Sequence, residues 1–397
     1  MRVDGGRARP SRRAVLGSTA LAALWVAAGC SGDDPDDADG AAGRTASPSP
    51  DQPSGTAAAI TWANWPDYID VADDDPEQRP TLEAFTDQTG IQVDYREDIN
   101  DNQEFVDGIE GDLAKRRPVG YDVMALTSWM SARLVRAGQV QRLDRSLIPN
   151  SANLVAALSE PDWDPGRDFS MPWQAGLTGI AYDARRVERA IGSVSELIER
   201  SDLAGRVGFL TEFSDTVGMV VLASGGNPTD LVTRDVEDAV DRIGELQETG
   251  QVSSFYGNDF VRGLRTGEIA ACLAWSGDVL QMQLENPNIK FVVPEEGLMI
   301  WSDDMLVPRA STKGAAVAKL VDYYYDPKVA AKVAAWVNYI CPVEGAQEEM
   351  QRIDPDLALS PLIFPDASVL DRSYQFQSLA EDDDVRLRKA FSALTEA

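Results

Sequence analysis

From about residue 58 onward, short apolar runs alternate with stretches whose apolar positions recur every three or four residues. The short runs predict strands at residues 58–63, 91–95 and 121–126. The helical spacing between them predicts helices over residues 81–89, where Gly90 would end the helix, and over residues 102–115. Strands that alternate with helices in this way predict a parallel α/β sheet.

The alternation continues through the second half of the chain. Further strands are predicted at residues 176–182, 206–211, 270–275, 290–293 and 305–308. Residues 169–173 lead into the first of them. Helical spacing covers residues 313–338 and is interrupted near Asp326-Pro327. About 340 residues follow the N-terminal segment, which is enough for two lobes, each with its own core.

The first thirty residues have the layout of an export signal. Ser11-Arg12-Arg13 is a twin-arginine start, and residues 14–29 carry no charge. That stretch is shorter than the ~20 apolar residues that span a bilayer. Ala27-Ala28-Gly29-Cys30 resembles a bacterial lipobox, in which the cysteine is lipidated and becomes the new N-terminus. We therefore expect residues 1–29 to be a twin-arginine lipoprotein signal peptide; a plain signal peptide with an incidental cysteine is the alternative.

Residues 30–56 form a segment rich in Asp, Gly, Ala, Ser and Pro, with no aliphatic residue larger than Ala. Such a segment cannot bury enough apolar surface to fold, so we expect a disordered tether. No later segment is long and apolar enough for a membrane span. The expected location is the extracytoplasmic face of a bacterial cell membrane, with a lipid as the anchor.

The charge and the residue types missing from the chain limit its chemistry. The net charge of −29 includes five arginines and one aspartate in the first 29 residues, so the exported chain carries about −33. This acidity excludes nucleic acid as a partner. It fits either a cationic ligand or a general need for solubility. The chain has no histidine, which excludes Ser-His-Asp and Cys-His catalysis and His-based zinc sites. Cys272 and Cys341 could pair or remain free thiols.

Aromatic and acidic side chains follow two of the predicted strands. Trp65, Asp67 and Tyr68 come after the strand at residues 58–63, and Ser128 and Trp129 come after the strand at residues 121–126. Ligands of parallel α/β sheets bind beyond the carboxyl ends of strands. No Gly-rich nucleotide motif follows either strand. The pattern predicts a pocket of rings and oxygen atoms.

These residues belong to a series of segments that resembles the spermidine/putrescine-binding proteins. The segments occur in the same order as in that family, at residues 60–69, 85–93, 121–129, 171–173, 210–211, 274–278, 294–297, 301–303 and 338–343. The resemblance implies a type II periplasmic-binding-protein-like fold, an α/β fold with a ligand cleft between two lobes. Residues 57–174 and 302–337 would form lobe 1, and residues 175–301 and 338–397 would form lobe 2.

The resemblance also implies which side chains bind the ligand. They are Trp65, Asp67, Tyr68, Ser128, Trp129, Asp215, Trp275, Asp278, Trp301 and Asp303. The sequence departs from the family after Leu210-Thr211, because Thr216 stands where the family's more distal glutamate is expected. Asp215 or Glu212 would have to substitute for it, which leaves the length of the ligand open.

A polyamine ligand explains these residue types. Its methylene groups pack against aromatic walls, and an ammonium group over a ring face gains about 0.5–2 kcal/mol. Ammonium groups that leave water must pair with carboxylates. Such a pocket is expected to lack Lys and Arg.

The implied protein is the substrate-binding lipoprotein of an ABC importer and not an enzyme. A ligand that touches Trp65, Tyr68, Ser128 and Trp129 in one lobe and Trp275 and Asp278 in the other would favour the closed state. The closed form would then dock on the permease. The expected partners are the polyamine, the permease and the membrane through the lipid anchor; we expect a monomer without a cofactor or metal.

Three alternatives remain. The same fold could bind another small amine or an ω-amino acid, but that ligand's carboxylate needs an arginine, and Arg206, Arg262 and Arg265 lie outside the segments assigned to the pocket. A secreted hydrolase with Asp278 and Asp303 as paired carboxylates is a second alternative. A surface lipoprotein without a transport role is the third.

Replacing Cys30 by alanine tests the anchor. The variant has no thiol at the lipobox, so we expect it to leave the membrane fraction, as measured by cell fractionation and immunoblotting. The neighbouring Ser31→Ala variant serves as the control and should stay with the membrane. A Cys30→Ala protein that remains in the membrane fraction would contradict the lipobox prediction.

Overall fold

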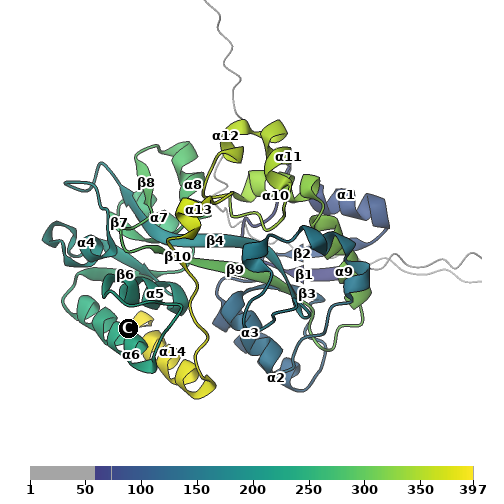
Figure 1. The fold of residues 1–397 in the computed structure, drawn as a ribbon, viewed down its shortest axis with the longest axis horizontal. Helices are drawn as coiled ribbons and strands as arrows, with labels where there is room; N and C mark the ends of the chain where they lie inside the picture. Colours follow the sequence, from purple (N-terminus) through teal and green to yellow (C-terminus); the bar gives the residue numbers. More distant parts are fainter. Residues whose placement is uncertain (1–58, 73, 397) are drawn as a thin grey trace, which may run out of the picture.

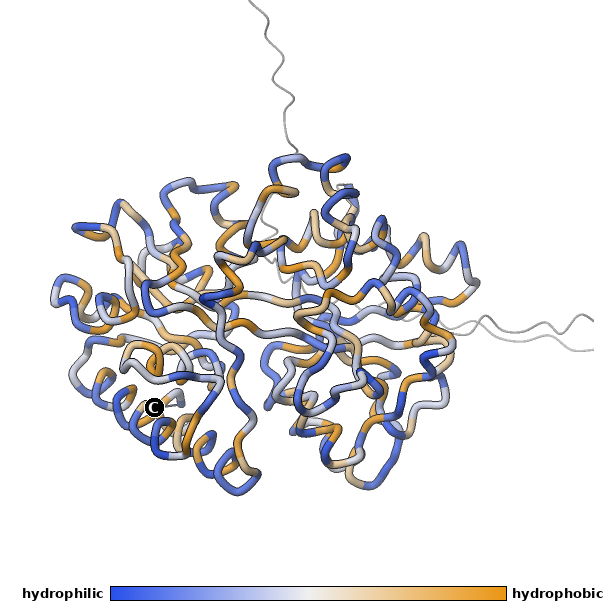
Figure 2. The backbone as a smooth tube through the Cα atoms, in the orientation of Figure 1, coloured by the Kyte–Doolittle hydropathy of each residue, from blue (hydrophilic) through white to orange (hydrophobic). Residues whose placement is uncertain are grey.

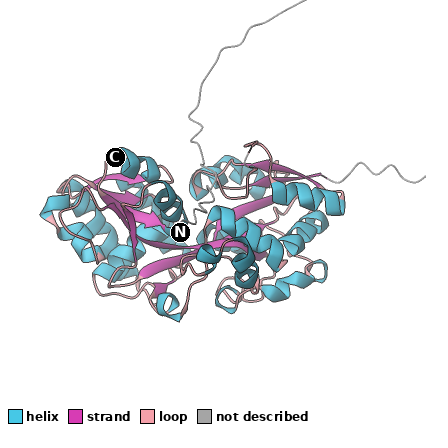
Figure 3. Ribbon diagram, turned by 90° about the horizontal axis from the view of Figure 1, so that it is seen from above, coloured by secondary structure: helices cyan, strands magenta, loops and turns pink. Residues whose placement is uncertain are grey.

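The computed structural model of the protein describes residues 59–72 and 74–396, which form two lobes that share one sheet (Figure 1). The ten strands of the described residues lie in the order β2-β1-β3-β9-β4-β7-β5-β6, with β10 beside β9 and β8 beside β4. Seen from above, helices gather at both ends of the molecule and strands run between them (Figure 3). The predicted two-lobed α/β architecture is confirmed.

One lobe is built on three parallel strands, as the sequence pattern predicts. These strands are β1 (Ala59–Ala63), β2 (Gln92–Arg96) and β3 (Val123–Thr127). Their helices are α1 (Pro80–Thr89), α2 (Asn102–Ala114) and α3 (Ser128–Arg136). Gly90 ends α1 with a φ of 72°, and the Asp101 carboxylate caps α2 by accepting hydrogen bonds from two backbone N–H groups.

Two long strands, β4 (Ser170–Asp183) and β9 (Leu298–Leu306), connect the lobes. They pair antiparallel along most of their lengths, and β9 also pairs with β3. The strand predicted at residues 176–182 is therefore only part of β4, and the one predicted at residues 305–308 overlaps only the end of β9. All residues of β4 are buried, so no polar alternation marks its extent, and Pro172 lies at a bulge that breaks the pattern.

The second lobe continues the sheet beyond β4. Its strands are β5 (Val207–Leu210), β6 (Val252–Tyr256), β7 (Ala271–Trp275) and β8 (Ile289–Val292). Its helices are α4 (Val194–Glu199), α5 (Phe213–Ala223), α6 (Thr233–Glu248), α7 (Phe260–Thr266) and α8 (Ser276–Glu285). Strands β5, β6 and β7 are parallel, whereas β7 and β8 run antiparallel to β4.

The last third of the chain crosses the molecule more than once. Helices α9 (Gly314–Tyr324) and α10 (Pro327–Val337) confirm the predicted helical stretch and its break, with Asp326 as the N-cap of α10. Elements without a sequence prediction follow: α11 (Ala346–Ile353), α12 (Pro355–Ala358), α13 (Ala367–Leu370), β10 (Ser373–Tyr374) and α14 (Glu381–Thr395). Helix α11 packs on α10, whereas α14 packs on α6 in the second lobe.

Both lobes have apolar interiors, and hydrophilic residues lie mainly at the periphery, in loops and along the outer helices (Figure 2). One buried ion pair stands out at the central strands: Arg167 Nη1 lies 2.7 Å from Asp304 Oδ1, with side-chain exposures of 3% and 0%. Cys272 and Cys341 are buried free thiols. Among the described residues, no helix is long and apolar enough to cross a membrane.

Two parts of the sequence-based domain division remain predictions. The signal peptide (residues 1–29) and the tether (residues 30–56) lie outside the described residues. The residue ranges of the two lobes also stay predictions.

Candidate functional site

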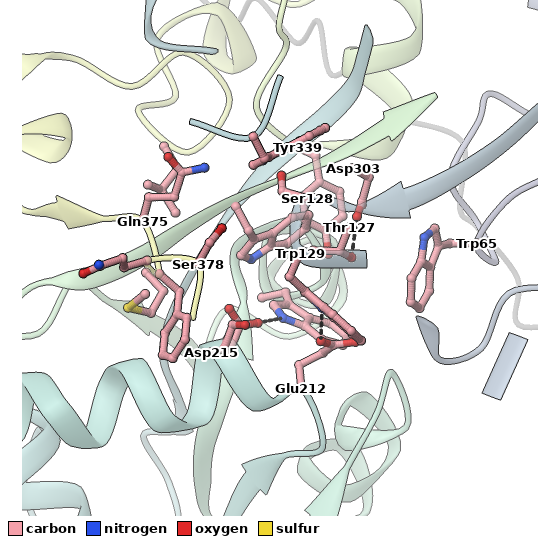
Figure 4. A pocket seen from close by; sticks show the side chains of 18 of the residues that line it. Trp65, Thr127, Ser128, Trp129, Glu212, Asp215, Asp303, Tyr339, Gln375 and Ser378 are labelled. Carbon is pink, nitrogen blue, oxygen red and sulfur yellow. Dashed lines mark hydrogen bonds between the residues drawn. The ribbon is translucent and has the colours of Figure 1, made fainter. Parts of the chain in front are cut away.

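A pocket lies between the two lobes, where the carboxyl ends of several strands converge. It contains about 1160 Å³ of space free of protein atoms, its open mouth included. Residues that follow β1, β3, β5 and β7, together with residues of β9, supply its walls (Figure 4). This position matches the general rule that open α/β sheets bind ligands beyond the carboxyl ends of their strands.

All ten side chains assigned to a ligand site from the sequence line this pocket. They are Trp65, Asp67 and Tyr68 after β1, Ser128 and Trp129 in α3, Asp215 in α5, Trp275 and Asp278 at the β7–α8 junction, and Trp301 and Asp303 in β9. The fold thus brings segments from the whole length of the chain to one cavity. Their contacts with a ligand stay a prediction.

Three of the pocket's carboxyl groups stand at the start of helices. Glu212 precedes α5, Asp215 lies in the first turn of α5, and Asp278 lies in the first turn of α8. The free N–H groups and the positive dipole end of a helix favour a negative charge there by about 0.3–1 kcal/mol. The strand-then-helix geometry therefore aims these carboxyl groups at the pocket and offsets part of the cost of burying them.

Asp303 accepts hydrogen bonds from two hydroxyl groups, one from the loop after β1 and one from the last residue of β3. Tyr68 Oη donates to Asp303 Oδ2 over 2.8 Å, and Thr127 Oγ1 donates to Oδ1 over 2.7 Å. The residue is only 4% exposed. Burial raises the pKa of Asp303 to about 7, although both hydrogen bonds lower it. No basic side chain of the described residues forms a salt bridge with it.

Asp278 and Asp215 each accept a hydrogen bond from an aromatic residue of the pocket. Tyr339 Oη donates to Asp278 Oδ2 over 2.9 Å, and Trp275 Nε1 donates to Asp215 Oδ2 over 2.7 Å. Burial raises the pKa of Asp278 to about 7 and that of Asp215 to about 6. Both groups are therefore placed to lose a proton near neutral pH when a positive charge approaches.

Glu212 connects the two lobes. Its Oε1 accepts a hydrogen bond from Asn102 Nδ2 over 2.9 Å, and its Oε2 accepts one from Trp129 Nε1 over 3.1 Å. Burial, with the nearby Asp101 and Asp215 carboxylates, raises the pKa of Glu212. Thr216 does not line the pocket, because its side chain turns back and donates to the Leu210 carbonyl oxygen over 2.8 Å. Of the candidates in this run, Glu212 and Asp215 reach the cavity.

Aromatic rings form a continuous wall along the pocket. The ring centroids lie 5.4 Å apart for Tyr68 and Tyr339, 5.6 Å for Tyr339 and Trp301, and 6.4 Å for Trp301 and Trp275. Such a wall can pack against an apolar ligand segment, and its ring faces attract cations.

Two glycines make room for this wall. A Cβ atom at Gly176 would lie 2.3 Å from the Trp301 ring, and one at Gly277 would lie 2.4 Å from the Tyr339 ring. Any larger residue at either position would displace the ring. Gly277, in the Trp275-Ser276-Gly277-Asp278 run, therefore leaves the space that the Tyr339 ring occupies.

The carboxyl groups are distributed along the pocket. Within residues 59–72 and 74–396, no group of three or more Cys, Asp or Glu side chains is arranged to hold a metal ion. Glu212, Asp215, Asp278 and Asp303 each have their own hydrogen-bond donors. This arrangement suits an elongated ligand with separate positive charges and an apolar part.

The sequence-based expectation that the pocket lacks Lys and Arg is wrong. Arg136, at the end of α3, and Arg388, in α14, both line it. Arg206, Arg262 and Arg265 do not. Arg388 was missed because α14 has no sequence signal that connects it to a site formed by strands.

Other pocket residues were also missed. Tyr339 lies in the segment 338–343 that carries part of the resemblance, and its ring marks it as a candidate. The stretch from Gln375 to Leu379 lines the pocket as well, but its position depends on the long return of the chain after β10 (Figure 4). No local pattern in that stretch indicates such a role.

The chain is similar to known proteins in sequence and in fold. The profile of the bacterial extracellular solute-binding proteins matches residues 80–361. The spermidine/putrescine-binding periplasmic protein of Escherichia coli K12 is 24% identical over 310 residues, which cover 77% of this chain and 83% of that protein.

Solved structures show the same two-lobed fold. The substrate-binding protein PotD of the spermidine/putrescine ABC transporter from Streptococcus pneumoniae has a TM-score of 0.69 at 21% identity, over 85% of this chain and 99% of that one. The Tp0655 lipoprotein of Treponema pallidum has a TM-score of 0.71 at 15% identity, over 85% and 100%. The periplasmic-binding-protein-like architecture expected from the sequence is confirmed.

The buried carboxyl groups predict how stability depends on pH. Because the pKa of Asp278 is raised to about 7, the native state holds a proton there that the unfolded chain releases near pH 4. The free energy of unfolding should therefore fall as pH rises from about 4 to about 7, by at most about 1.4 kcal/mol per pH unit for this group. The Asp278→Asn variant should show a shallower fall in urea titrations of the ligand-free protein.

The exposed Asp241 in α6 provides the matched control. Asp241→Asn should keep the pH dependence of the wild type. If Asp278→Asn and the wild type lose stability equally over this pH range, the carboxyl group does not hold a proton at neutral pH.

Proposed function

This chain belongs to the bacterial extracellular solute-binding proteins, and we propose that it captures a polyamine for an ABC importer. One observation carries the proposal: the aromatic pocket contains the buried carboxyl groups of Asp215 and Asp303 and the partly buried one of Asp278, and no basic side chain of the described residues pairs with them. A ligand that brings its own positive charges is the partner these groups lack.

A polyamine fits the pocket along its length. Ammonium groups would pair with Asp278 and Asp303, and the methylene segment would lie on the rings of Tyr339 and Trp301. Ammonium groups near those ring faces would gain further attraction. The expected effect of binding is a loss of protons from the carboxyl groups, because a nearby positive charge favours the charged form. The relatives named for spermidine and putrescine support a ligand of this class.

Binding would stabilise the closed arrangement of the lobes. Trp65, Tyr68, Ser128 and Trp129 come from the β1–β3 side of the molecule, and Trp275 and Asp278 come from the other side. Only a closed state offers both sets of contacts to one ligand, so the ligand shifts the population toward that state. The closed form would be the one that the permease recognises.

The related proteins are transport proteins, and they support a binding role without catalysis. The environments of Asp278 and Asp303 agree with it, since each accepts a tyrosine hydrogen bond and each has a pKa of about 7. A hydrolytic pair needs environments that drive the two pKa values apart.

The protein would act at the outer face of the cell membrane. The twin-arginine signal would export the chain, Cys30 would carry the lipid, and residues 30–56 would tether the folded part to the membrane. A monomer with one pocket would then deliver its ligand to the permease on the same membrane.

One observation favours a second candidate, an ω-amino acid or another zwitterionic amine. Arg136 is exposed, lines the pocket, and forms no ion pair with any described residue. It could receive the carboxylate of such a ligand. Arg388 is less suitable, because its Nε already pairs with Asp384 Oδ1 at 2.9 Å.

Calorimetry of the purified chain with putrescine, spermidine, spermine and γ-aminobutyrate tests both candidates. We expect at least one polyamine to bind more tightly than γ-aminobutyrate. Combining Trp275→Ala with Asp278→Ala removes a ring and a carboxylate, and it should weaken polyamine binding roughly 100-fold or more, because a desolvated charge loses its partner.

The exposed Asp241→Ala variant is the control and should bind as the wild type does. Absence of binding by all polyamines, or undiminished binding by the double variant, would refute the polyamine proposal. Tighter binding of γ-aminobutyrate that Arg136→Gln abolishes would support the second candidate in its place.

A further inference from the structure

One ring of the pocket already has a cation on its face. The Cζ atom of Arg388 lies 3.8 Å from the ring centroid of Trp129, and it lies 4.6 Å from the centroid of Phe213. Trp129 is one of the rings assigned to the ligand from the sequence, and it comes from the opposite lobe to α14. The guanidinium group therefore occupies the kind of position that a ligand ammonium group would take.

The surroundings of this ring are those of a complete cation site. Glu212 Oε2 accepts the Trp129 Nε1 hydrogen bond, and burial together with the nearby Asp101 and Asp215 carboxylates raises the pKa of Glu212 to about 8, although Arg388 lowers it. An aromatic face with a carboxyl group beside it is the same combination that Tyr339 and Asp278 offer elsewhere in the pocket. The difference is that Arg388 supplies the positive charge from within the chain.

Arg388 is fixed in this position. Its Nε pairs with Asp384 Oδ1 at 2.9 Å one helical turn away, and its side chain is only 15% exposed. Helix α14 packs against α6 (Figure 1), and Phe391 of the same helix lies 5.6 Å from the Phe213 ring. The guanidinium group is therefore part of the second lobe's packed structure, and displacing it would disturb several contacts.

We propose that Arg388 determines the length of the ligand by filling the cation site at Trp129 and Glu212, so that the pocket selects a diamine over longer polyamines. The inference rests on the proposed function. Asp215, Asp278 and Asp303 remain for the ligand's charges, and a third ammonium group that extends toward Trp129 meets the positive charge of Arg388. Repulsion and the blocked ring face both disfavour that longer ligand.

Calorimetry of the full-length chain with putrescine and spermidine tests the proposal through the ratio of their affinities. Arg388→Ala uncovers the Trp129 ring and leaves the Glu212 carboxyl group without a nearby cation. The preference for spermidine over putrescine should rise by roughly 2-fold to 30-fold, the range expected for one ammonium group on an aromatic face. Arg388→Lys keeps a positive charge and should keep the ratio of the wild type.

Arg386 provides the matched control on the same helix. It pairs with Glu237 and Asp383, is 52% exposed, and does not line the pocket. Arg386→Ala should leave the ratio unchanged. An unchanged ratio in Arg388→Ala, or an equal loss of affinity for both amines, would overturn the proposal, because Arg388 would then only hold α14 against Trp129.

Two further outcomes separate the inference from the proposed function. A wild type that binds neither amine refutes the proposed function and the inference with it. A wild type that binds both, while Arg388→Ala keeps the ratio, refutes only the inference. If Arg388→Ala does not fold, a crystal structure of the wild type with spermidine decides: Arg388 should remain on Trp129, and a ligand ammonium group in its place would overturn the proposal.

Discussion

A carboxyl group that is removed from water must either pair with a positive charge or keep a proton. The central strands of this protein show both solutions side by side. Asp303 and Asp304 are neighbours in β9, and because side chains alternate along a strand they face opposite sides. Asp304 pairs with the buried Arg167 and stabilises the junction of β4 and β9. Asp303 faces the pocket, where only hydroxyl groups reach it. The same residue type thus forms an ion pair on one side of the strand and, on the other side, supplies an acid that is hydrogen-bonded but has no salt bridge to a described basic side chain.

The rest of the site repeats this arrangement. Strands β5 and β7 end at the pocket, and the helices that follow begin with Asp215 and Asp278. The helix ends favour the charged carboxylates and burial disfavours them, so the pKa values of these groups lie near neutral pH. A cationic ligand can therefore shift the groups toward the charged form. A ligand that covers the aromatic rings would displace water from the cavity, which strengthens each electrostatic interaction inside it. Arg388 shows how a cation lies on a ring of the pocket, because its Cζ atom is 3.8 Å from the ring centroid of Trp129.

The sequence predicts the local parts of this structure well. The elements from β1 to β3 follow apolar patterns that depend only on near neighbours, and the predicted bounds agree within two residues, whereas α3 was not predicted. Strands β4 and β9 were recognised only in part, because residues such as Pro172 and Asp303 interrupt their apolar runs for reasons that lie in the tertiary structure. The ten pocket residues came from an ordered resemblance to a family. Arg388 could not be found in this way, because an arginine in an amphipathic C-terminal helix has the appearance of a surface residue until the fold brings it to Trp129.

Without a ligand, Asp278 and Asp303 keep part of their protons near pH 6.5 to 7, and a cationic ligand should release them. The most direct test is calorimetric titration of putrescine at about pH 6.5 in two buffers that differ in ionisation enthalpy. The difference in heat gives the number of protons exchanged on binding. We predict a net release of roughly one proton or more per bound putrescine. Carboxyl groups with pKa values of about 6 to 7 lose their protons when an ammonium group pairs with them. Binding without proton release would contradict it.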